Sequence, residues 1–190
     1  MRWAHHVRGI RNSSAKAGDL VAILGIGGLG HLAVQYARRM GFEVVAIGRG
    51  KDTAELAKTL GAHQYIDSVE ANLGEALQAM GGATLVVSTA SDGKSLAEAV
   101  KGLRPCGSLL ALGATAEPLG SSANDLLFGS KSIVGSLTGD PATGDATLKF
   151  SVLTGVAAMI ETMPLERASE AYARMISGDV RFRMVLTMGQ

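Results

Sequence analysis

The chain has 190 residues, of which 47% are hydrophobic and 18% charged, so it can bury a sizeable core and a disordered chain is excluded. Its 18 basic and 17 acidic residues give a formal net charge of +1 without a run of one sign, which argues against a nucleic-acid-binding protein. Cys106 is the only cysteine, which excludes an internal disulfide and a thiolate-based structural zinc site within this chain.

The apolar stretches are too short to span a bilayer, and the N-terminus lacks the apolar core of a signal peptide. We therefore expect a protein without a membrane partner, and the single cysteine fits a reducing, cytoplasmic setting.

Short β-branched apolar runs alternate with longer amphipathic segments from residue 19 to about residue 136, which is typical of βαβ units. The expected strands cover residues 20–24, 43–47, 64–66, 83–88, 108–112 and 132–136. The expected helices cover residues 29–40, 53–60, 72–80, 94–103 and 124–128. The order predicts an α/β protein with a doubly wound Rossmann sheet of six parallel strands.

The pattern changes after residue 140, where we expect a helix, a strand, a second helix and a last strand over residues 145–153, 159–163, 165–177 and 182–188. We divide the chain into an N-terminal segment (1–17), a dinucleotide-binding domain (18–140) and a short α+β tail (141–190). The last strand ends wholly apolar, so it requires a partner sheet.

A glycine-rich turn directly follows the first expected strand and opens the first long helix; it reads Gly25-Ile26-Gly27-Gly28-Leu29-Gly30. Such a turn meets a pyrophosphate with backbone N–H groups and the positive end of the helix dipole. Gly25 permits the tight turn, Gly27 admits the phosphate with further room at Gly28, and Gly30 lets the helix pack on the strand. Its position favours a dinucleotide site over a plain tight turn in some other α/β protein.

The end of the second expected strand bears on the choice between NAD and NADP. NAD sites carry Asp or Glu there for the ribose hydroxyls, whereas this chain has Gly48 followed by Arg49 and, two residues on, Lys51. A guanidinium and an ammonium suit a 2′-phosphate, so the loop favours NADP, with NAD as the alternative. Asp52 is interpreted as a helix N-cap, and the two cations could also be solvated loop residues. The missing acid also argues against a methyltransferase.

The segment over residues 19–37, which contains the glycine turn, resembles the zinc-containing alcohol dehydrogenases of the medium-chain dehydrogenase/reductase superfamily. Further similar segments follow in family order and cover residues 60–62, 65–67, 103–107, 132–136, 171–175 and 181–186. The zinc-free quinone reductases typically have a different, alanine-led glycine turn and are the second choice.

The resemblance implies hydride transfer between alcohols and aldehydes, in an enzyme of roughly twice this size with a zinc-bearing catalytic domain before this one. No counterpart of the zinc ligands occurs here, so we assign no catalytic or metal-binding residue and expect the chain alone to be inactive. His5 and His6 are interpreted as part of an exposed terminus. A free-standing cofactor-binding or regulatory module and a quinone reductase-like enzyme remain alternatives.

The family fold also implies cofactor contacts from strand ends beside the ribose and nicotinamide, from Ser88, Thr89, Leu112, Gly113 and Ala114. His31 is interpreted as an ordinary helical residue rather than a phosphate contact, and Cys106 as structural. The strand over residues 132–136 is expected at the sheet edge, where it would join two copies in a homodimer.

Overall fold

The computed structural model describes residues 4–137 and 139–189. The chain divides into two compact units, residues 1–156 and 157–190. The first contains a six-stranded sheet and the second a two-stranded sheet. Among the described residues, no helix is both long and apolar enough to cross a membrane.

The six strands of the first unit are all parallel and lie in the order β3-β2-β1-β4-β5-β6, which confirms the doubly wound Rossmann sheet. They are β1 (Leu20–Leu24), β2 (Glu43–Gly48), β3 (Gln64–Asp67), β4 (Ala83–Ser88), β5 (Leu103–Ala111) and β6 (Ser132–Gly135). The strand order reverses between β1 and β4. Ligands of such sheets bind outside the carboxyl ends of the strands at this reversal.

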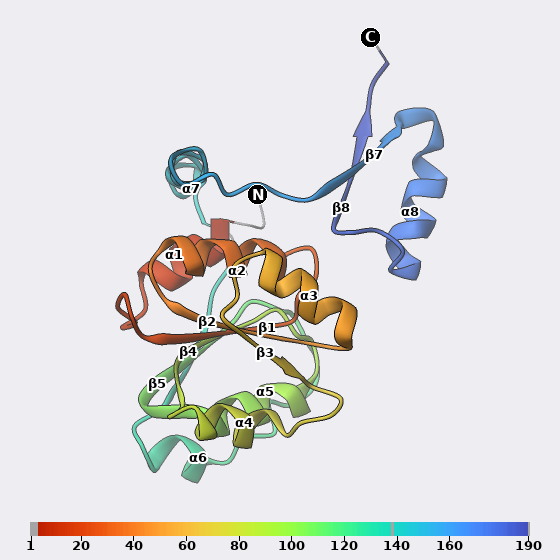
Figure 1. The fold of residues 1–190 in the computed structure, drawn as a ribbon. Coiled ribbons are helices and arrows are strands. Elements are labelled where there is room, and N and C mark those ends of the chain that lie inside the picture. The colour runs from red at the N-terminus through yellow and green to blue at the C-terminus, as the bar shows by residue number, and fades with distance from the viewer. Residues whose placement is uncertain (1–3, 138, 190) are drawn as a thin grey trace. The chain divides into compact units, whose positions relative to one another are not determined.

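Helices cover both faces of the sheet (Figure 1), with α1, α2 and α3 on one face and α4, α5 and α6 on the other. Their bounds are α1 (Ala4–Arg11), α2 (Gly30–Arg39), α3 (Lys51–Thr59), α4 (Leu73–Ala79), α5 (Gly93–Lys101) and α6 (Ala123–Leu127). A separate buried apolar cluster lies on each face. Burial on both faces explains why the central strands are continuous apolar runs rather than alternating ones.

Helix α1 was not predicted, because residues 1–17 were treated as an N-terminal segment without assigned structure. Val7 and Ile10 are buried in it, and Gly9 packs so close to the sheet that a Cβ there would overlap the side chain of Leu110. His6 is also fully buried, so the expectation that it belongs to an exposed terminus is wrong. His6 is buried because it lies on the side of the amphipathic helix α1 that packs against the rest of the unit.

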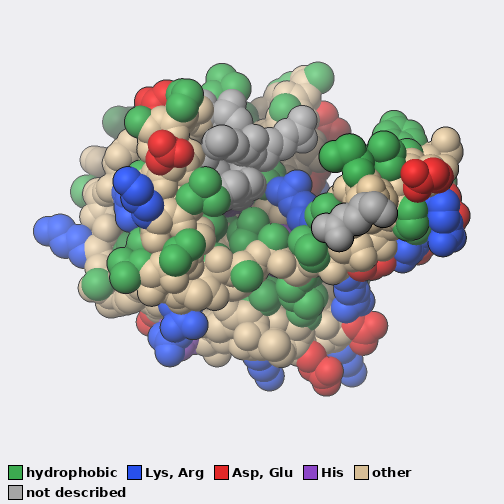
Figure 2. Space-filling model, turned by 90° about the horizontal axis from the view of Figure 1, so that it is seen from above, with side chains coloured by type: hydrophobic (Ala, Val, Ile, Leu, Met, Phe, Trp, Pro, Cys, Tyr) green, Lys and Arg blue, Asp and Glu red, His purple; other side chains and the backbone are tan. Residues whose placement is uncertain are grey.

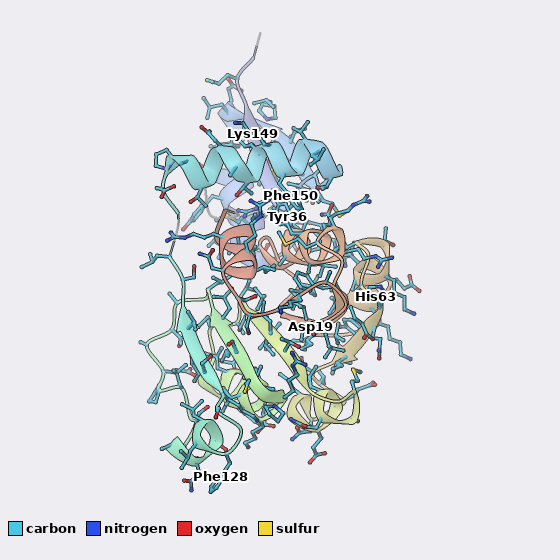
Figure 3. All side chains as sticks on the ribbon, turned by 90° about the vertical axis from the view of Figure 1, so that its left-hand side faces the viewer. Asp19, Tyr36, His63, Phe128, Lys149 and Phe150 are labelled. Atoms are coloured by element: carbon cyan, nitrogen blue, oxygen red, sulfur yellow. The ribbon has the colours of Figure 1, made fainter. Side chains whose placement is uncertain are left out.

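Helix α7 (Pro141–Thr154) belongs to the first unit, whereas our sequence division placed it in the tail. Phe150 of α7 lies over Tyr36 of α2, with ring centroids 6.1 Å apart (Figure 3). The buried Tyr36 hydroxyl also lies 2.8 Å from Ser151 Oγ, and burial raises the pKa of this tyrosine. These contacts hold α7 to α2.

Strand β5 begins at Leu103, five residues before the predicted start, and it contains a bulge. Leu103 pairs with Ala83 and Ser108 pairs with Leu85, so four residues of β5 lie opposite one residue of β4. The bulge accommodates Pro105, and it holds Cys106 exposed at a φ of 60°. The observed strand therefore includes residues 103–107, which precede the predicted strand.

The second unit consists of β7 (Ile160–Pro164), a short 3-10 helix η1 (Leu165–Arg167), α8 (Ala168–Ser177) and β8 (Arg183–Thr187). Strands β7 and β8 pair in parallel, so β7 supplies the partner that the apolar last strand requires.

On the molecular face seen in Figure 2, acidic and basic side chains are interspersed rather than gathered by sign.

Candidate cofactor site

A pocket of about 400 Å³ lies at the carboxyl ends of β1, β2 and β4, where the strand order reverses. It is lined by Leu24, Gly25, Ile26, Gly27, Ile47, Gly48, Arg49, Thr53, Ser68, Thr89, Ala90, Ser91, Asp92 and Ser95. The glycine turn, the loop after β2 and the first residues of α5 therefore meet around one space.

Each glycine of the turn faces a different environment. Gly25 has a φ of +92°, and a Cβ there would lie 2.6 Å from Thr89 Oγ1, which donates to the carbonyls of Leu24 and Gly25 at 3.2 Å. A Cβ on Gly30 would overlap the carbonyl oxygen of Gly25, so α2 packs directly on the turn. A Cβ on Gly27 would meet nothing within 4 Å, so this residue faces open space.

The start of α2 supplies donors and positive potential beside this opening. Leu29 stands at the N-cap and makes no side-chain hydrogen bond to the first turn, so no side chain neutralises the dipole there. His31 is buried, with Nδ1 3.1 Å from the carbonyl oxygen of Gly27. That position confirms a packed helical histidine rather than one that reaches into the pocket.

The loop after β2 is held by side chains of α3 and β3. Thr53 Oγ1 donates to the Arg49 carbonyl at 2.8 Å, and the Tyr65 hydroxyl donates to the Gly50 carbonyl at 3.1 Å. The Gly50 N–H donates to Asp67 Oδ2 at 3.0 Å. The Gly48 carbonyl accepts from the N–H of residue 68 at 2.9 Å and from its Oγ at 3.0 Å. The backbone of the loop is thus preformed, while the Arg49 side chain is exposed.

Across the pocket from this loop, Asp92 is the N-cap of α5 and accepts the Ser95 N–H at 2.8 Å. That hydrogen bond lowers the pKa of Asp92, and the positive charge of Arg49 contributes in the same direction. The pocket therefore has a cation on one wall and a carboxylate on the other.

Five of the predicted cofactor residues line the pocket, namely Gly25, Gly27, Gly48, Arg49 and Thr89. Gly28, Leu29 and Gly30 lie in the turn and at the start of α2 without lining it. Lys51 begins α3 and lines a neighbouring hollow with Tyr65 and Asp67. Asp52 lies in the first turn of α3, and Gly50 takes the N-cap position that the sequence suggested for Asp52.

Apart from Thr89, the predicted residues at the ends of β4 and β5 do not line the pocket; they are Ser88, Leu112, Gly113 and Ala114. Ser88 is buried, and its carbonyl accepts the N–H groups of Leu112 at 2.9 Å and Gly113 at 3.3 Å. A Cβ on Gly113 would overlap the carbonyl oxygen of Ala90, so these two strand ends pack tightly. Ala114, the next residue, is exposed.

Sequence reasoning missed Thr53, Ser68, Ser91, Asp92 and Ser95 as pocket residues. Ser68 directly follows β3 and Asp92 directly precedes α5, so the rule that strand ends and helix starts form such sites could have found both. Nothing in the sequence distinguishes Thr53 from other residues in a first helical turn.

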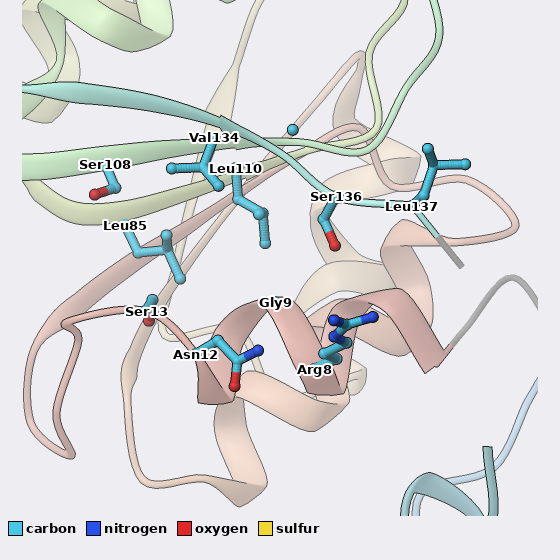
Figure 4. A pocket seen from close by; sticks show the side chains of 11 residues that line it. Arg8, Gly9, Asn12, Ser13, Leu85, Ser108, Leu110, Val134, Ser136 and Leu137 are labelled. Carbon is cyan, nitrogen blue, oxygen red and sulfur yellow. The ribbon is translucent and has the colours of Figure 1, made fainter. Parts of the chain in front are cut away.

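Another hollow, of about 420 Å³, lies between α1 and the strands β4 to β6 and shares no lining residue with the candidate cofactor pocket. Figure 4 shows Arg8 and Asn12 of α1 facing Leu110 and Val134 of the sheet across it.

Within the part of the chain that the structure describes, no three His, Cys, Asp or Glu side chains gather as a metal site.

Comparison with known proteins identifies the family. Residues 28–152 match the model of the zinc-binding dehydrogenase family. The alcohol dehydrogenase notN of Aspergillus sp. (strain MF297-2) is 46% identical over 183 residues, which cover 94% of this chain and 52% of that protein.

Two solved structures share the fold. The acetophenone reductase of Geotrichum candidum NBRC 4597, in complex with NAD, has a TM-score of 0.81 at 24% identity, covering 98% of this chain and 53% of that one. A protein of Sinorhizobium meliloti 1021, described as a zinc-binding dehydrogenase and bound to NADP, has a TM-score of 0.80 at 26% identity, covering 90% and 53%. The chain thus spans about half the length of these proteins. It belongs to the zinc-binding dehydrogenase family, of which it has the coenzyme-binding domain.

Proposed function

We propose that this chain is the NADP(H)-binding domain of an alcohol dehydrogenase-like oxidoreductase. The observation that carries the proposal is the loop after β2, where Gly48 replaces the expected acid and Arg49 lines the pocket. A 2′-phosphate would meet the Arg49 guanidinium there through charge-assisted hydrogen bonds. Lys51, two residues on, would add a positive charge beside the pocket rather than a direct contact.

The glycine turn fits the pyrophosphate of a dinucleotide. The open space beside Gly27 is where backbone can approach a phosphate, and α2 begins three residues later with its positive end towards the turn. When bound, the nicotinamide ring supplies hydride exchange with an alcohol or aldehyde carbon. The chain's own residues bind and orient the cofactor for that step.

The choice of NADP over NAD rests on charge. An NAD site needs a side-chain acceptor for two ribose hydroxyls at the end of β2. Gly48 stands at that position and has no side chain that could accept them. The Sinorhizobium protein bound to NADP supports the proposal, whereas the Geotrichum enzyme bound to NAD keeps NAD as the alternative.

The Arg49→Ala variant tests this assignment by calorimetric titration with NADPH and NADH. Loss of a charge-assisted contact should weaken NADPH binding about tenfold to a hundredfold and leave NADH nearly unchanged. Lys58→Ala is the matched control, because Lys58 is an exposed α3 cation outside the pocket. An unchanged ratio of the two affinities in Arg49→Ala would contradict the assignment.

We also propose that the chain binds cofactor without oxidising alcohols by itself. It spans about half the length of its relatives. The glycine turn and Arg49 in its pocket suit the phosphates of a dinucleotide rather than a substrate carbonyl. Mixing the chain with NADPH and simple aldehydes should leave the nicotinamide absorbance constant. Turnover above the buffer rate, in protein purified to homogeneity, would overturn this part of the proposal.

We propose that two copies pair along β6. This strand ends the sheet, and Val134 on it is 47% exposed, with the apolar Leu127 and Phe128 exposed at the end of α6 nearby in sequence. A Val134→Lys variant should shift sedimentation from dimer to monomer. Val69→Lys is the control, because Val69 is 73% exposed just after β3 at the opposite sheet edge. A wild-type chain that is monomeric at a concentration on the order of 10 μM would refute the pairing.

A further inference from the structure

Gly48, at the end of β2, has a backbone conformation that does not require glycine. Gly48 does not have a positive φ, so any L residue can adopt its backbone conformation. What sets it apart is its surroundings. A Cβ at this position would lie 2.8 Å from Thr53 Cγ2 and 3.1 Å from the Tyr65 hydroxyl oxygen. Even an alanine would therefore displace a neighbour.

Neither neighbour can withdraw without losing a hydrogen bond. Thr53 is β-branched, and the bond from its Oγ1 to the Arg49 carbonyl fixes the rotamer that aims its methyl group at Gly48. Tyr65 stands beside Ala46 in the parallel register of β2 and β3, and its hydroxyl is held by the Gly50 carbonyl. The space beside Gly48 is thus filled by two side chains that also fix the loop.

We infer that Thr53 and Tyr65 are specificity-determining residues, because they occupy the space through which an acid at position 48 would reach a ribose diol. The inference rests on the proposed NADP preference and extends it. The preference for NADP over NAD then has two causes. Position 48 carries no acid, and the filled space beside it would keep an introduced acid from reaching the ribose. A Gly48→Asp substitution alone should not create an NAD site.

Two conservative substitutions open the space, and each Gly48 variant is compared with its own parent because Tyr65→Phe also removes the bond to the Gly50 carbonyl. Thr53→Ser removes only the methyl group and keeps the hydroxyl that binds the Arg49 carbonyl. Tyr65→Phe removes the hydroxyl and leaves the ring atom Cε2 at an ordinary contact distance of 3.4 Å from a Cβ at position 48. Asp67 stays unchanged in every variant, because its carboxylate holds the Gly50 N–H.

The test places Gly48→Ala and Gly48→Asp in the wild-type chain and in the Thr53→Ser/Tyr65→Phe background. Thermal unfolding is measured for every variant, and NADH and NADPH affinities are measured by calorimetry. Gly48→Ala should lower the Tm of the wild-type chain and have little effect in the opened background. Gly48→Asp should improve NADH binding about tenfold or more only in the opened background, because the carboxylate can then accept from the ribose hydroxyls.

The outcomes separate this inference from the proposed function. If Gly48→Asp improves NADH binding equally in both backgrounds, or in neither, the specificity role of Thr53 and Tyr65 is overturned. Equal Tm losses for Gly48→Ala in both backgrounds would overturn the steric argument as well. A wild-type chain that prefers NADH would refute the proposed cofactor instead, and the Tm comparison would still be informative about the packing.

Discussion

Alanine at two glycines of the same turn should affect two different properties. Gly30→Ala should lower the stability of the fold, and Gly27→Ala should lower the affinity for the cofactor. In an ordinary helical position, Gly→Ala stabilises by about 1 kcal/mol. At Gly30 the sign should reverse, because the new methyl group would overlap the backbone carbonyl oxygen of Gly25. Backbone cannot rotate away as a side chain can, so we expect a net loss in the range of about 1 to 3 kcal/mol, typical of overpacking.

At Gly27 the same methyl group would meet nothing within 4 Å, so the unfolding free energy should stay within about 1 kcal/mol of wild type. The methyl would, however, stand in the space assigned to the pyrophosphate. Calorimetric titration with NADPH should therefore show affinity reduced about tenfold or more in Gly27→Ala. Urea unfolding of both variants measures the stability difference.

Two results would refute this reasoning. A Gly27→Ala chain that folds normally and binds NADPH as wild type does would show that the pyrophosphate does not lie beside Gly27. A Gly30→Ala chain as stable as wild type would show that the helix does not pack on the turn as closely as the structure indicates.

Two further predictions concern helix packing and capping. Ser151 Oγ donates to the Thr147 carbonyl, so Tyr36 is the donor in its own bond to Ser151; Tyr36→Phe should cost about 1 kcal/mol in urea unfolding, and adding Ser151→Ala should cost less than additivity requires. Asp92→Ala removes the α5 cap and should cost about 1 kcal/mol at neutral pH. The hydrogen bond from Ser95 and the charge of Arg49 place the pKa of Asp92 below its ordinary 3.8 in the folded state, so the carboxylate stabilises the fold above pH 3.8. That contribution should be lost as pH falls through the lower folded-state pKa, and a wild-type advantage that instead grows on acidification would contradict this.

The sheet could be predicted from the sequence because its strands are buried on both faces. The bounds of β1 and β4 match the predicted ones, and all six strands occur in the predicted order, since continuous apolar runs between glycines leave few alternatives. Helix ends were predicted less well. Helix α3 begins at Lys51 rather than Thr53, because Gly50 instead of Asp52 takes the N-cap position.

Other features depend on contacts that periodicity does not encode. Helix α1 was missed because a terminal segment with two histidines gave no core signal, yet it packs on α2 and buries His6. The bulge at Pro105 was left out of the predicted strand, because proline usually stands outside central strands.

The lining of the candidate cofactor pocket could be predicted only in part. Motif knowledge places the glycine turn, Gly48 and Arg49, whereas Ser68 and Asp92 enter the pocket through the positions of β3 and α5. The filled space beside Gly48 could not be foreseen, because it depends on which side-chain atoms of Thr53 and Tyr65 meet it.

The central claim is that this chain binds a dinucleotide at the glycine turn and prefers NADPH. The most direct measurement is calorimetric titration of the wild-type chain with NADPH and with NADH under the same salt conditions. We expect one site per chain and an NADPH affinity about tenfold or more above that for NADH. Absence of binding by both nucleotides, or tighter binding of NADH, would contradict it.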